Sequence, residues 1–88
     1  MWLNKLTQMK IPAIKKLVET YNLAQLQEAE AALLEEQKPA IDVEGDDEGE
    51  QLTHILASLY IKDKMEHHGT AFNQALRDFS QRVRNSIR

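Results

Sequence analysis

The chain has 88 residues, a length that corresponds to one domain, because a hydrophobic core rarely divides into two below roughly 200 residues. It contains no cysteine, which excludes internal disulfides, thiolate metal sites and thiol chemistry. No apolar run approaches the roughly 18 residues that span a bilayer, and the first residues lack the pattern of a secretion signal. We therefore expect a cytoplasmic protein that does not span a membrane.

The charge is unevenly distributed along the chain, although the net charge is only −3. Residues 1–22 carry a net charge of +3, residues 23–50 of −9 and residues 51–88 of +3. Two explanations are open at this point. The basic helices dock beside the acidic middle through exposed ion pairs, or one charged patch faces a charged partner.

A hydrophobic period of about 3.6 residues runs through most of the chain and predicts helices. In the first half it predicts a helix over 12–21, with Pro12 in its first turn, and a second helix over 23–37. Asn22 is expected to cap the second helix, because its side chain accepts a hydrogen bond from an unpaired backbone amide. Pro39 limits how far this helix extends.

Residues 40–44 interrupt the helical period, because Ile41 and Val43 alternate with acidic residues between a proline and a glycine. This alternation predicts a short extended segment, and the chain offers it no second strand. Either the segment is a tethered loop whose two apolar side chains plug the helical core, or it pairs with its copy in a dimer.

The second half of the chain predicts two longer helices, over 47–67 and 71–86. An aspartate at position 46 or 47 is expected to cap the first of them, and Gly69 is expected to end it in a left-handed conformation. Apolar residues surround most of the helix over 47–67, which indicates burial on nearly every side. This helix is either the central helix of the domain or one whose second face contacts another subunit.

A homodimer would bury the second face of that helix together with the extended segment. The candidate interface residues are Ile41, Val43, Ala57, Ile61 and Met65. The acidic run beside them would set orientation and encounter rate more than affinity. The candidate acidic docking residues are Asp42, Glu44, Asp46, Asp47, Glu48 and Glu50.

The sequence shows no recognisable catalytic, metal or cofactor site. Glu50 with His54, and Asp63 with His67, have the i, i+4 spacing of a pair of metal ligands, but two ligands do not complete a site. The acidic run from Asp42 lacks the glycine and glutamate of an EF-hand loop at their required positions. No nucleophile elbow or glycine-rich phosphate loop is present. We expect a protein that is not an enzyme and has no cofactor.

The last predicted helix carries a narrow basic face opposite its apolar stripe. Arg77, Arg84 and Arg88 fall within about 40° of one another on that helix. Such a face can hold phosphates, so it supports an alternative role in association with DNA or RNA. The acidic net charge argues against that role, and we do not expect nucleic acid as the main partner.

The run MKIPAIKKLVETYN from residue 9, the segment EGDDEGEQLTH at 44–54 and the ending ALRDFSQRVRNSI form a distinctive pattern. With this pattern, residues 9–88 resemble a small bacterial family of domains of unknown function. The resemblance implies one helical domain over 9–88 behind an N-terminal extension over 1–8. It implies no activity and no functional residues.

We therefore predict a small all-α domain of four helices with a short extended segment near residues 40–44. The function that we expect is non-enzymatic protein binding by a homodimer that also binds an unidentified protein. The alternative is a nucleic-acid accessory protein that uses the basic face of its last helix.

Overall fold

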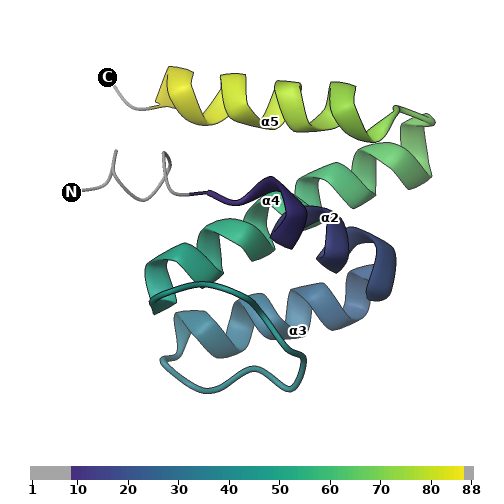
Figure 1. The fold of residues 1–88 in the computed structure, drawn as a ribbon. Coiled ribbons are helices and arrows are strands. Elements are labelled where there is room, and N and C mark those ends of the chain that lie inside the picture. Colours follow the sequence, from purple (N-terminus) through teal and green to yellow (C-terminus); the bar gives the residue numbers. More distant parts are fainter. Residues whose placement is uncertain (1–8, 87–88) are drawn as a thin grey trace.

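The computed structural model of the chain describes residues 9–86, and these residues form four helices and no strand. Figure 1 shows them in chain order: α2 (Ile11–Thr20), α3 (Leu23–Leu34), α4 (Glu48–His68) and α5 (Phe72–Ser86). The predicted all-α fold is confirmed. The predicted extension over 1–8, and Arg88 of the predicted basic face, lie outside the described residues. None of the described helices is long and apolar enough to cross a membrane.

Helix α4 is the central helix of the domain. Each of α2, α3 and α5 packs against it. In Figure 1, α3 and α5 lie on opposite sides of α4, and α2 lies across it. Of the two predicted positions for this helix, the central one is confirmed, because its apolar sides are covered by three helices of the same chain.

The core consists of two clusters of buried side chains that meet along α2 and α4. The first cluster joins α3 and α4 through Leu17, Leu26, Ala29, Leu33, Val43 and Ile55. The second cluster joins α4 and α5 through Ile14, Val18, Ala57, Ile61 and Ala75. Helix α2 contributes side chains to both clusters, so it connects the cluster between α3 and α4 with the cluster between α4 and α5.

The segment around residues 40–44 is a tethered loop. This agrees with the first of the two predicted alternatives, in which its apolar side chains pack into the helical core. Val43 is buried in the first cluster, and Ile41 is half-buried against it. The chain bends at Ala40 and Ile41, so the segment is not a strand in the described structure. Its two apolar side chains therefore pack into the helical core of their own chain.

The structure corrects the predicted interface residues on α4. Ala57 and Ile61 are fully buried, and they pack with residues of α2 and α5. Met65 is half-buried against the same cluster. The apolar pattern that suggested a second face for another subunit reflects burial inside this chain, and Val43 is buried in the same way. Of the five candidate interface residues, Ile41 and Met65 keep part of their surface exposed.

Three predicted helix ends are confirmed. The Asn22 side chain accepts from the Gln25 amide at 2.8 Å, and the Gln25 side chain accepts from the Asn22 amide at 2.9 Å, which completes a capping box. The Asp47 side chain accepts from the Glu50 amide at 2.8 Å. Gly69 ends α4 in the left-handed conformation, with a φ of 66°.

The predicted end of the second helix is wrong by three residues, because α3 ends at Leu34 and not at Gln37. Glu36 adopts a left-handed φ of 59°, and the Gln37 amide donates to the Ala32 carbonyl at 2.8 Å. Together with the bond from the Glu36 amide to the Leu33 carbonyl at 3.1 Å, this bond forms the terminating motif in which glycine usually takes the left-handed position. Glutamate in that position gave no sequence signal.

Candidate functional site

The linker between α3 and α4, residues 35–47, forms one wall of a solvent-exposed groove. The groove has a volume of about 290 Å³. We call it the linker groove; its lining residues are Lys38, Pro39, Ala40, Ile41, Asp42, Val43 and Gln51. Gln51 comes from the first turns of α4, and its side-chain amide donates to the Val43 carbonyl at 3.0 Å. This hydrogen bond therefore attaches the linker wall of the groove to the central helix.

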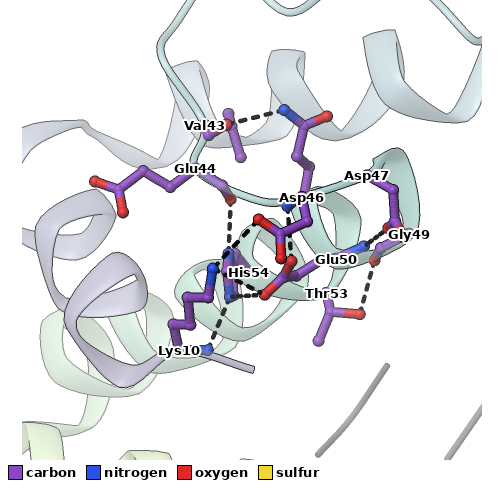
Figure 2. A network of polar contacts seen from close by, with 10 residues as sticks. Lys10, Val43, Glu44, Asp46, Asp47, Gly49, Glu50, Thr53 and His54 are labelled. Carbon is purple, nitrogen blue, oxygen red and sulfur yellow. Dashed lines mark hydrogen bonds and ion pairs between the residues drawn. The ribbon is translucent and has the colours of Figure 1, made fainter. Parts of the chain in front are cut away.

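The linker is also attached through a polar cluster with a buried centre at the start of α4, shown in Figure 2. We call it the His54 cluster; it consists of Lys10, Glu44, Asp46, Glu50 and His54. The His54 and Glu50 side chains are 0% and 1% exposed. Lys10 lies immediately before α2, and Glu44 and Asp46 lie in the linker, so the cluster joins three segments.

The hydrogen bonds of His54 fix its tautomer. The Lys10 backbone amide donates to Nε2 at 2.9 Å, so Nε2 carries a lone pair and no proton. The Nδ1 atom lies 2.8 Å from the Glu44 carbonyl oxygen, which only accepts. The ring is therefore neutral with its proton on Nδ1, and it donates to the linker while it accepts from the start of α2.

Glu50 is held by only one of its carboxylate oxygens. Oε1 accepts from the Asp46 amide at 2.7 Å. Oε2 is buried without a hydrogen bond; it lies 3.7 Å from the Lys10 ammonium and 4.0 Å from His54 Nε2. Burying a charged oxygen without a hydrogen bond lowers the stability of the fold unless a cation lies beside it. The Lys10 ammonium supplies that positive charge.

The His54 cluster is not arranged for acid–base or nucleophilic catalysis. Both ring nitrogens of His54 are engaged by backbone groups, so neither one faces a substrate. Ser58 follows His54 by one turn, but its hydroxyl donates to the Ile55 carbonyl at 2.8 Å. Glu50, His54 and Ser58 thus follow one side of α4 without forming a catalytic triad.

The predicted acidic docking residues separate into several structural roles. Glu44 pairs with Lys16 at 3.5 Å, and Asp46 pairs with Lys10 at 3.5 Å. These pairs confirm that basic residues around α2 dock beside the acidic linker. Of the remaining acids, Asp47 caps α4, Glu50 is buried, and Asp42 and Glu48 are exposed. Within residues 9–86, no group of three acidic or imidazole side chains is placed to hold a metal ion.

The predicted basic face is present on α5 in part. Arg77 and Arg84 are exposed. A different arginine of this helix, Arg82, lies over the Tyr60 ring, with its guanidinium carbon 5.6 Å from the ring centroid. Tyr60 in turn contacts Phe79, with 5.7 Å between ring centroids, so this arginine supports the packing of α5 on α4.

The sequence interpretation missed the burial of Glu50, His54 and Ser58. A signal was available, because these three polar residues follow one another at steps of four and share a helical face with Ile61. Polar residues on an apolar helical face point to a buried hydrogen-bond network. The partners of that network, the Lys10 amide and the Glu44 carbonyl, are backbone groups and leave no trace in the sequence.

Comparisons with known proteins give a family but no activity. Neither a curated protein nor a solved structure matches this chain. The model of a family of unknown function, DUF6952, matches residues 9–88. This match spans both features described above, the linker groove and the His54 cluster, and it leaves residues 1–8 outside. The chain belongs to this family of unknown function, DUF6952.

Proposed function

We propose that the domain is a non-enzymatic protein-binding module and that the linker groove is its binding surface. The observation that carries the proposal is an apolar wall held in place by side chains of α4. Gln51 donates to the Val43 carbonyl, and His54 donates to the Glu44 carbonyl. A surface that is ordered before binding loses less conformational entropy when a partner arrives.

The size and chemistry of the groove favour a protein partner over a small molecule. Its volume of about 290 Å³ is at the lower limit of pockets that enclose drug-sized ligands, and it is open to solvent. Such a groove accepts a side chain of a protein. Lys38 and Asp42 line it beside the apolar residues Pro39, Ala40 and Ile41, so a partner would add polar contacts at the edge of an apolar contact.

A second copy of the chain is the first partner to test. The wild-type protein is compared with Ile41→Asp by light scattering over a wide range of concentrations, and Leu56→Asp is the matched control. Ile41 lines the groove, whereas Leu56 is 39% exposed on α4 and does not line it. A dimer that Ile41→Asp abolishes and Leu56→Asp preserves supports self-association through the groove. A wild-type protein that stays monomeric excludes the homodimer.

The absence of cysteine allows a direct test for other partners, because one introduced thiol carries one label. A photoactivatable crosslinker is attached at Ala40→Cys in the groove and, in a control protein, at Leu34→Cys. Leu34 is 63% exposed near the end of α3 and does not line the groove. A protein captured from Ala40→Cys alone supports the proposal. Equal capture from both positions, or from neither, contradicts it.

A second candidate function is nucleic-acid association, and one observation favours it. Arg77 and Arg84 are exposed on α5, where phosphates can reach them. Fluorescence anisotropy with labelled DNA and RNA at low salt tests this function, with the double variant Arg77→Glu, Arg84→Glu as the control. Binding that falls steeply with salt and disappears in the variant supports it, and a flat titration removes it.

A further inference from the structure

The His54 ring connects the start of α2 to the linker through its two nitrogens. Lys10 donates its backbone amide to Nε2 at 2.9 Å, and Nδ1 donates to the Glu44 carbonyl at 2.8 Å. The buried Glu50 oxygen Oε2 lies 4.0 Å from Nε2 and has no hydrogen bond. An ionisable ring is thus held beside an anionic oxygen that it does not yet contact (Figure 2).

We propose that His54 is a proton-operated latch that holds the start of α2 on α4 when the ring is neutral and releases it when the ring is protonated. On protonation, Nε2 changes its partner from the Lys10 amide to the Glu50 carboxylate. This inference does not depend on the proposed protein-binding function. It concerns a conformational change within the domain.

The neutral state is the one that the structure shows. Since Nε2 accepts from the Lys10 amide, the first residues before α2 are attached to the central helix. The Lys10 carbonyl in turn accepts from the amides of Ala13 and Ile14, at 3.1 and 3.2 Å, so the attached residue also anchors the first turn of α2. The latch therefore acts on the beginning of a helix.

A proton on Nε2 reverses the role of that atom from acceptor to donor. The ring N–H would then face the Lys10 N–H, and two donors do not form a hydrogen bond. Glu50 Oε2, a buried acceptor without a hydrogen bond, lies 4.0 Å from Nε2, and a side-chain rotation would bring the two atoms within hydrogen-bond distance. Nδ1 keeps its proton and its bond to Glu44 in both states, so the linker stays attached while the start of α2 is released.

The charged groups around the ring come from each segment of the cluster. The Glu50 carboxylate of α4 lies 4.0 Å from Nε2, and the linker contributes the exposed carboxylates of Glu44 and Asp46. The Lys10 ammonium lies 3.7 Å from Glu50 Oε2, the oxygen with which a protonated ring would pair. The Lys10 ammonium also pairs with Asp46 at 3.5 Å, and the Lys10 side chain is 51% exposed, so its interaction with Glu50 is shared with Asp46 and weakened by solvent. Lys16 is directed to the Glu44 carboxylate, on the outer side of the linker.

Release of Lys10 would also affect the second core cluster. Met9, the residue before Lys10, packs against the cluster that contains Ala57, Ile61 and Ala75. When the Lys10 amide loses its acceptor, Met9 is no longer held over these residues by a hydrogen bond. Acidification would therefore expose one edge of the contact between α4 and α5.

The test is a nuclear magnetic resonance titration of the full chain from mildly alkaline to acidic pH. Histidine is the side chain whose charge ordinarily changes in that range. Ring nitrogen spectra report the tautomer of His54, and the amide spectrum reports the hydrogen bond of Lys10. We expect the tautomer protonated on Nδ1 at high pH. We also expect the Lys10 amide to shift and to exchange faster as His54 takes up its second proton.

Two variants separate the latch from general acid effects. Glu50→Gln removes the charge that the protonated ring would pair with, so the shared transition of His54 and Lys10 should move to lower pH. His67→Gln removes an exposed histidine that lies 2.7 Å from Asp63, and the Lys10 transition should stay where it is. A ring protonated on Nε2 at high pH overturns the proposal. So does a Lys10 amide that does not follow His54, or a Glu50→Gln transition at unchanged pH.

Discussion

Gly45 occupies a position in the linker that no larger residue fits. A Cβ atom added there would lie 2.7 Å from the Gln51 Cγ atom and 2.8 Å from the Gln51 backbone nitrogen. The side chain can rotate, but the nitrogen donates to the Asp47 carbonyl at 3.0 Å in the first turn of α4 and is fixed. The linker must therefore move away from α4 in the Gly45→Ala variant.

The cost of that movement follows from the contacts on either side of Gly45. Overpacking against a fixed atom costs about 1–3 kcal/mol. Two hydrogen bonds next to Gly45 would weaken: the bond from the Asp46 amide to Glu50 and the bond from His54 to the Glu44 carbonyl. Each contributes about 1 kcal/mol to the free energy of unfolding. We expect Gly45→Ala to lower the free energy of unfolding by roughly 3 kcal/mol.

Gly69→Ala is the matched control, measured by urea denaturation followed by circular dichroism. Gly69 has a left-handed φ of 66°, but a Cβ atom there meets no atom within 4 Å. Only the backbone strain remains, and it costs about 1 kcal/mol. If Gly45→Ala destabilises the protein no more than Gly69→Ala does, the linker yields freely and the reasoning about its attachment to α4 is refuted.

Three further predictions concern the core and a helix cap. Ile61→Asp should unfold the protein, because Ile61 is fully buried. Leu56→Asp, on the exposed side of α4, should leave the circular dichroism spectrum unchanged. A folded Ile61→Asp protein would contradict the placement of Ile61 in the core. Leu26→Ala should lower the free energy of unfolding by about 2–5 kcal/mol, and Leu34→Ala by less than about 0.5 kcal/mol; similar losses would mean that the burial of Leu26 is misassigned. Asn22→Ala removes one bond of the capping box and should cost about 1 kcal/mol in thermal denaturation, and no loss would show that the cap does not stabilise α3.

The elements that the sequence predicted well depend on local chemistry. The helical period, the cap at Asn22 and the terminator at Gly69 each involve residues within a few positions of one another. The early end of α3 was not predictable in this way, because Glu36 adopts a conformation that usually marks a glycine. Its side chain therefore gave no local signal for the end of the helix.

The candidate site was less predictable because long-range contacts determine it. An apolar pattern around the whole of α4 is compatible with burial inside one chain or between two copies, and only the placement of α2 and α5 assigns Ala57 and Ile61 to the interior. His54 shows the same limit. Its spacing from Glu50 is visible in the sequence, but its hydrogen bond to Lys10 spans 44 positions and ends on a backbone amide.

The central position of α4 has a consequence for local opening of the domain. Because α2, α3 and α5 each pack on α4, an outer helix can separate while the rest of the core stays in contact. Helix α5 contributes only to the second core cluster, so its detachment leaves the cluster of Leu26, Val43 and Ile55 intact. Native-state hydrogen exchange should therefore find the slowest amides in the middle of α4 and a separate, less protected unit in α5.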